Sequence, residues 1–235
     1  MTSTLALEVK GLQAWYGESH VLHGIDFEVN KGECVSLLGR NGAGRTSTLR
    51  AILGLTSRRT GLVKIQGRDV MSLQTHQIAR LGVGYCPEER AIYSSLSCEE
   101  NLLLPPVFRP GGMPLEEIYE LFPNLKERRK SQGTRLSGGE QQMLAMARIL
   151  RTGADILFLD EISEGLAPVI VEKLAQVITT LKERGYTILL VEQNFEFASE
   201  LAERLYVIEH GEVVSHIPAS EIASKHEELK ELLGI

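Results

Sequence analysis

Hydrophobic and polar residues alternate along residues 5–10 and 25–29, and this period of two predicts β-strands. Residues 34–38 differ, because a nearly continuous apolar run is typical of a strand buried on both faces. Further strands are predicted at residues 62–65 (followed by a turn at 67–70), 83–86, 156–159, 187–191, 205–208 and 213–216. The last two read as a hairpin across residues 209–212.

Helical periodicity separates most of these strands. Helices are predicted at residues 45–53, up to 81, 99–104, 115–122, 140–149, 169–184, 195–203 and 221–233. Six prolines punctuate residues 87–135, which favours short helices there. We therefore expect one domain over residues 1–235, with a core formed by 1–86 and 154–235. A small helical subdomain is expected to be inserted at approximately 87–153.

Composition and charge exclude several classes of protein. The chain has 235 residues, of which 43% are hydrophobic, as in ordinary globular proteins. The net charge of −6 argues against a general nucleic-acid binder. We expect no membrane span and no secretory signal, and hence a cytoplasmic protein. Three widely spaced cysteines, Cys34, Cys86 and Cys98, indicate reduced, buried residues and neither a metal site nor disulfides.

A glycine loop carries the first candidate chemistry. Residues 39–46, GRNGAGRT, follow a predicted strand, precede a predicted helix, and match GxxxxGK[ST] except at Arg45. The backbone N–H groups of such a loop bind phosphates, and the Thr46 hydroxyl, with Ser47 beside it, can bind Mg²⁺. A loop that merely turns the chain is the alternative. The candidate nucleotide-binding residues here are Gly39, Arg40, Asn41, Gly42, Ala43, Gly44, Arg45, Thr46 and Ser47.

Two carboxylates end the predicted strand 156–159. Asp160 is expected at the carboxyl end of this strand, where α/β proteins bind ligands, and would hold Mg²⁺ through water. Glu161 is the candidate general base, because it lies next to that metal and could polarise an attacking water. A solvated strand end is the alternative, which the glycine loop makes less favourable.

A second glycine-rich segment, LSGGEQ, opens the predicted helix at residue 140, and a helix start of this kind attracts anions. The order of glycine loop, LSGGEQ and carboxylate pair resembles the nucleotide-binding domains of ATP-binding cassette (ABC) proteins. The resemblance implies an α/β fold with a P-loop NTPase-like core, an N-terminal antiparallel β subdomain and an inserted α-helical subdomain. It implies ATP and Mg²⁺ as cofactors, and a dimer in which LSGGEQ contacts the ATP of the partner. These signature residues are Leu136, Ser137, Gly138, Gly139, Glu140 and Gln141.

The resemblance assigns roles to other residues. Tyr16 matches the aromatic that stacks on adenine, with a surface aromatic capping the core as the alternative, and residues 163–166 match the D-loop at the dimer interface. Glu88 stands where most members carry the Q-loop glutamine, Gln193 replaces the switch histidine, and Ile162 replaces a proline. The resemblance therefore assigns Glu161 and Gln193 to catalysis, and Thr46, Glu88 and Asp160 to metal binding.

The strings SGGEQQMLAMAR, EGLAP and LLVEQN resemble ATP-binding subunits of branched-chain amino acid importers. This implies an ATPase at the cytoplasmic face of the membrane. Its partners would be a second ATP-binding subunit, membrane permease subunits and, indirectly, a solute-binding protein, with no nucleic acid. Alternatives are an importer of amides or urea, and a hydrolysis-impaired partner of a heterodimer, which Arg45 and Gln193 suggest. A cassette ATPase that acts on ribosomes or DNA is a further alternative.

Overall fold

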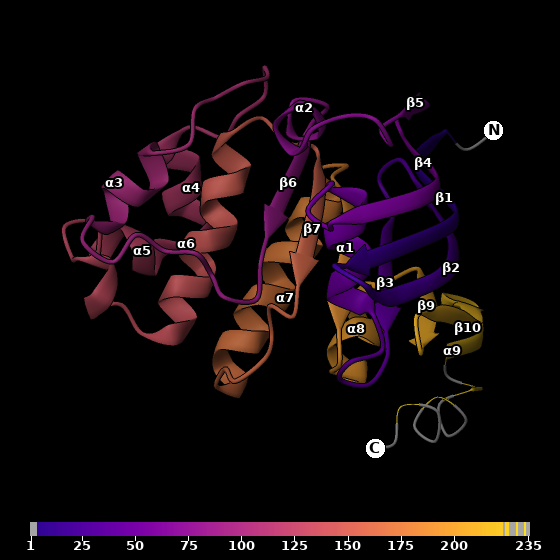
Figure 1. Ribbon diagram of the computed structural model, residues 1–235. Coiled ribbons are helices and arrows are strands. Elements are labelled where there is room, and N and C mark those ends of the chain that lie inside the picture. Colours follow the sequence, from indigo (N-terminus) through magenta and orange to yellow (C-terminus); the bar gives the residue numbers. More distant parts are fainter. Residues whose placement is uncertain (1–3, 223, 226–228, 230–232, 234–235) are drawn as a thin grey trace.

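Two β-sheets organise the protein, whose computed structural model describes residues 4–222, 224–225, 229 and 233 (Figure 1). The first sheet is antiparallel, with the strand order β2-β1-β4-β5. Its strands are β1 (Leu5–Tyr16), β2 (Ser19–Asn30), β4 (Arg58–Ile65) and β5 (Arg68–Asp69). The strands β1 and β2 are longer than predicted. The register between them shifts, for example between Val9 and Leu12, and such a bulge breaks the alternation on which the prediction rests.

The second sheet has the strand order β10-β9-β3-β8-β7-β6. Its strands are β3 (Cys34–Leu38), β6 (Val83–Cys86), β7 (Ile156–Asp160), β8 (Thr187–Glu192), β9 (Arg204–Glu209) and β10 (Glu212–Pro218). All neighbouring pairs are parallel except β9 with β10, the predicted hairpin. Every residue of β3, β7 and β8 is buried, which explains their apolar runs.

The central sheet separates two apolar clusters. Alternate residues of β7 face opposite sides: Phe158 joins the cluster beneath the antiparallel sheet, and Leu157 joins the cluster on the other face. Helix α1 (Arg45–Ile52) contributes Leu49 and Ile52 to the first cluster. Helix α7 (Pro168–Glu183) contributes Leu174 and other residues to the second, to which α8 (Phe195–Leu201) also belongs. The helices α2 (Thr75–Ala79) and α9 (Ala219–Ile222) are short.

The helical elements between β6 and β7, most of them short as the prolines predict, lie beside the β6 edge of the central sheet, away from the antiparallel sheet (Figure 1). They are α3 (Cys98–Leu103), α4 (Leu115–Leu121), α5 (Pro123–Glu127), the 3₁₀ turn η1 (Gly133–Arg135) and α6 (Gly138–Arg151). The buried residues of α6, including Leu144 and Leu150, share an apolar cluster with the central sheet. The division into a core and a helical subdomain stays a prediction.

The α/β fold class is confirmed, and the differences lie at element boundaries and in α5 and η1, which were not predicted. Helix α6 begins at Gly138, two residues earlier than predicted, because Ser137 caps it. The predicted helix over 221–233 lies largely outside the described residues. Helix α9 ends at Ile222, and the described residues Leu229 and Leu233 are buried. Within the described residues, no helix combines the length and the apolar character that crossing a bilayer requires.

Candidate phosphate and carboxylate site

The glycine loop joins β3 to α1 and needs glycine at particular positions. Gly42 and Gly44 have φ values of 81° and 111°, in the region that favours glycine. A Cβ atom on Gly44 would lie 2.9 Å from Leu22, and one on Gly39 would collide with the carbonyl oxygen of Ile208. Gly44 is also the N-cap of α1, where no side chain caps the helix and no acidic residue occupies the first turn. The N–H groups at this helix start are therefore suited to an anion.

Arg45 lies inside the site, with only 3% of its side chain exposed. Its Nη2 donates to Glu161 Oε1 at 2.9 Å and to Asn41 Oδ1 at 3.2 Å. Its Nη1 is buried and has no hydrogen-bond partner within the described residues. The guanidinium thus joins the glycine loop to the end of β7 and retains donors that an anionic ligand can use. A cavity of about 160 Å³, lined by residues 42–47, Val21 and Glu161, lies beside it.

Asp160 is fully buried at the end of β7. One carboxylate oxygen accepts from Thr46 Oγ1 at 2.8 Å, and the other accepts from the Tyr85 hydroxyl at 2.8 Å. Burial raises the pKa of Asp160, whereas the two hydrogen bonds lower it. The structure therefore brings together Thr46 and Asp160, two of the three residues predicted to bind metal. Oxygen ligands of this kind suit Mg²⁺.

Sequence reasoning missed Tyr85. It lies in the predicted strand β6, next to β7, and burial raises the pKa of its hydroxyl above the usual range. The sequence feature that could have identified Tyr85 is a tyrosine near the carboxyl end of a buried strand. The pairing with Asp160 becomes visible only when the two strands are placed side by side.

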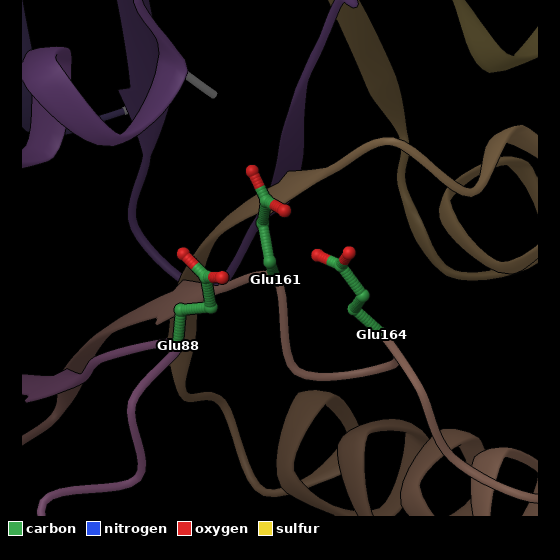
Figure 2. Close-up of side chains that lie close together, drawn as sticks. All are labelled: Glu88, Glu161 and Glu164. Atoms are coloured by element: carbon green, nitrogen blue, oxygen red, sulfur yellow. The ribbon is translucent and has the colours of Figure 1, made fainter. Parts of the chain in front are cut away.

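Glu161 and Glu164, on the loop that follows β7, lie beside Glu88, on the segment that follows β6 (Figure 2). A carboxylate oxygen from each lies within 4.8 Å of the others. Burial raises the pKa of Glu161 to about 7, aided by a hydrogen bond with Glu164 and by the charge of Glu88, while Arg45 lowers it. Burial, and then Glu164, also raise the pKa of Glu88. Such a group of carboxylates can hold a divalent cation or share a proton.

Of the residues assigned to metal binding, Glu88 lies in this carboxylate group with Glu161. Thr46 contacts Asp160 but makes no hydrogen bond to Glu88 among the described residues. The backbone of Glu161 has a φ of 49°, which is uncommon outside glycine, and its N–H donates to the carbonyl of Val191 at 2.8 Å. The structure thus holds the base candidate at the junction of β7 and β8.

Gln193 follows β8 and is half-buried. It lines a cavity of about 390 Å³ together with Glu161, Ser163 and Glu164. The preceding residue, Glu192, is 1% exposed and accepts hydrogen bonds from Ser163 N at 3.1 Å and Ser163 Oγ at 2.7 Å. Sequence reasoning did not single out Glu192. Its signal is a carboxylate that ends an otherwise apolar strand.

Tyr16 ends β1 and has 36% of its surface exposed, outside both apolar clusters. The neighbouring Trp15 is covered, since the His20 ring stacks on it at 4.2 Å and the Arg58 guanidinium lies 3.9 Å from its centre. These two residues are the partners of Trp15 on the flanking strands β2 and β4. Tyr16 is therefore the ring that a planar ligand can reach.

The LSGGEQ segment forms a capped helix start. Ser137 Oγ accepts from Glu140 N at 3.3 Å, and Glu140 Oε2 accepts from Ser137 N at 2.7 Å. Helix α6 and helix α1 lie on opposite sides of β6 and β7 in Figure 1. Among the described residues, no hydrogen bond or ion pair joins residues 136–141 to residues 39–47. One chain therefore leaves the two glycine segments apart.

Known proteins resemble this chain over most of its length. The family model for ABC transporters matches residues 22–164. The branched-chain amino acid transport ATP-binding protein BraG of Pseudomonas aeruginosa is 39% identical over 208 residues, which cover 87% of this chain and 89% of that protein. The lipopolysaccharide export ATP-binding protein LptB of Escherichia coli is 31% identical over 234 residues, 97% of each chain.

A solved structure agrees with these relatives. The dimeric structure of MJ0796, a bacterial ABC transporter cassette, matches with a TM-score of 0.79 and 25% identity, covering 91% of this chain and 98% of that one. The family model covers more than half of the chain, and the curated relatives extend the similarity across nearly all of it. This chain therefore belongs to the ABC transporter family, as an ATP-binding and ATP-hydrolysing subunit.

Proposed function

We propose that the glycine loop binds the phosphates of ATP and that Thr46 and Asp160 hold Mg²⁺. The observation that carries this assignment is the hydrogen bond between Thr46 and Asp160, which places two oxygen ligands beside the uncapped start of α1. Mg²⁺ bound there would neutralise charge on the β- and γ-phosphates. Tyr16 is proposed to stack on the adenine.

Glu161 is proposed as the general base, with Gln193 beside it as the residue that contacts the γ-phosphate. Both line the same cavity, and the raised pKa of Glu161, about 7, is matched to proton transfer near neutral pH. Gln193 can only donate or accept hydrogen bonds through a neutral amide, so it would orient groups and not transfer protons.

The ion pair of Arg45 affects the expected rate of ATP hydrolysis. The ion pair at 2.9 Å occupies one oxygen of Glu161 and draws negative charge away from it. A carboxylate engaged in this way is a weaker base for water. The same ion pair supports the second candidate function, a hydrolysis-impaired partner in a heterodimer.

A dimer is proposed as the active unit. In one chain the signature residues 136–141 lie away from the glycine loop, so a second chain would have to supply them to each nucleotide. The dimeric architecture of the similar cassette MJ0796 supports this arrangement. The partner subunit is either a copy of this chain or a different ATP-binding subunit.

Import of branched-chain amino acids is the proposed physiological role. BraG at 39% identity supports it over lipopolysaccharide export, because LptB is 31% identical. The proposed partners are membrane permease subunits and, through them, a solute-binding protein. The subunit would then sit at the cytoplasmic face of the membrane and would bind no nucleic acid.

Mg²⁺-dependent ATP turnover, measured against protein concentration, tests the proposal. A competent dimer gives turnover that rises faster than linearly and that disappears in Glu161→Gln. A flat zero in the isolated chain, restored on adding a second ATP-binding subunit, would support the heterodimer instead. Uptake of leucine by vesicles that contain the reconstituted transporter then tests the substrate, with loss of uptake in Glu161→Gln as the control.

A further inference from the structure

Glu192 is a buried carboxylic acid at the end of a strand whose packing does not require a polar side chain. It ends β8, whose preceding residues, Thr187 to Val191, are all buried and mostly apolar. Burial raises its pKa to about 7, and the charge of Glu164 adds to this, while Ser163 and Arg45 lower it. An apolar residue would avoid the cost of burying a carboxylate. A role in positioning other groups explains its presence.

Both oxygens of Glu192 are engaged by a single residue. Oε1 accepts from the backbone N–H of Ser163, and Oε2 accepts from its hydroxyl, at 3.1 and 2.7 Å. Ser163 is itself only 6% exposed. A two-point contact to a charged acceptor restrains both the distance and the orientation of the segment that donates.

The contact joins two segments with different proposed roles. Gln193, the next residue after Glu192, lines the cavity beside Glu161. Ser163 begins residues 163–166, the segment that the family resemblance assigns to the dimer interface. The backbone bond from Glu161 N to the Val191 carbonyl, at 2.8 Å, lies beside the Glu192 contact. The ends of β7 and β8 are therefore tied together by three hydrogen bonds.

We propose that Glu192 is a positioning residue that couples Gln193 to residues 163–166 through its two hydrogen bonds with Ser163. Movement of Gln193 on contact with the γ-phosphate is thereby transmitted to the segment that faces the second subunit. The inference rests on the proposed function, because it assumes the roles of Gln193 and of the dimer.

Variants of both partners test this coupling in a Glu161→Gln background, in which bound ATP persists. Ser163→Ala removes one hydrogen bond, and Glu192→Ala removes both. Glu192→Gln keeps them, since its amide oxygen can accept from the Ser163 N–H while its NH₂ donates to Ser163 Oγ. Ser36→Ala is a matched control, because Ser36 is also buried, on the neighbouring strand β3, and its hydroxyl has no partner within the described residues.

Sedimentation measures ATP-driven dimerisation, and titration with a fluorescent ATP analogue measures affinity in the monomer. We expect Ser163→Ala and Glu192→Ala to weaken dimerisation about tenfold, the size expected for losing a hydrogen bond to a charged group. Monomer affinity should stay constant, and Glu192→Gln and Ser36→Ala should change neither quantity. Equal losses of nucleotide affinity and of dimerisation, or unchanged dimerisation, would overturn the proposal.

Hydrogen exchange on the monomer gives a readout that does not need the dimer. Ser163→Ala should speed exchange at residues 192–194 as well as 163–166, and Glu192→Gln should not. Unchanged exchange at 192–194 in Ser163→Ala would overturn the coupling. If the Glu161→Gln parent fails to dimerise with ATP, alone and with a second ATP-binding subunit, while the exchange result holds, the proposed function fails and the physical coupling stands. Should Glu192→Ala not fold, Ser163→Ala carries both measurements.

Discussion

Arg45 differs from the lysine of the phosphate-loop pattern in the number of groups that its side chain can contact simultaneously. Its Nη2 contacts both Asn41 and Glu161, and its buried Nη1 remains available to a ligand. A lysine amine is a single point charge at the end of a flexible stem and cannot reproduce this fork. The residue that departs from the phosphate-loop pattern therefore also restrains the proposed base.

Replacing Arg45 should reveal the restraint. In Arg45→Lys the tie to Glu161 is weakened, and we expect ATP turnover to rise about tenfold, or roughly 1.4 kcal/mol in the barrier. Steady-state phosphate release measures it. Arg68→Lys, at an exposed position on β5 and outside the loop, is the control and should leave turnover unchanged. A fall in turnover for Arg45→Lys would mean that the guanidinium assists the reaction instead.

Glu192 should make stability depend on pH in a defined direction. Its pKa is raised from 4.5 to about 7 in the folded chain, so the folded state holds the proton more tightly than the unfolded state. Its stabilising contribution is fully present below about pH 4.5 and is lost as pH rises through about 7. Relative to Glu192→Gln, the wild type should therefore become less stable between pH 5 and 8, as measured by urea unfolding. A constant difference across this range would contradict the assignment.

At the scale of elements, Arg59 connects the loop helix to the antiparallel sheet. From β4 its guanidinium donates to the carbonyls of Ala51 and Ile52 at the end of α1, at 2.5 and 2.7 Å. It also donates to the carbonyls of Val70, Met71 and Leu73 beyond β5. Since α1 begins at the glycine loop, this contact fixes the helix that presents the loop.

Removing the Arg59 guanidinium should loosen α1 at its far end. Arg59→Met removes the side-chain donor of five carbonyls, of which those of Ala51 and Val70 keep a backbone N–H donor. We expect a loss of about 2–4 kcal/mol in the free energy of unfolding. Chemical denaturation measures this loss. Arg68→Met, at an exposed position on β5, is the matched control and should cost less than about 0.5 kcal/mol. Equal costs for both variants would show that Arg59 does not hold the helix.

At the scale of the whole molecule, the separation of the glycine loop from LSGGEQ predicts complementation between chains. Thr46→Ala disables the loop and Ser137→Arg disables the signature segment, so neither variant alone should hydrolyse ATP. In an equal mixture about half of the dimers are mixed, and each has one intact site, which gives about a quarter of wild-type turnover. No recovery at any mixing ratio would argue that this chain does not form such a homodimer.

The linear sequence determined the elements whose signals are local. The buried strands β3, β6, β7 and β8 appear as apolar runs, and the glycine loop and LSGGEQ appear as short strings whose residue types and spacing can be read directly from the sequence. Their order was enough to predict the α/β fold and the family. Strand lengths in the antiparallel sheet were wrong where bulges interrupt the alternation.

Only the tertiary structure decided which side chains meet. Arg45 and Glu161 are 116 residues apart, and Tyr85 and Asp160 are 75 apart, so no local period relates them. Their contacts exist because β6, β7, β8 and β3 run parallel in one sheet and end at the same edge. The hydrogen bonds between Glu192 and Ser163 follow from the same alignment of strands. Packing of the whole core specifies this alignment, and no short segment of the sequence does.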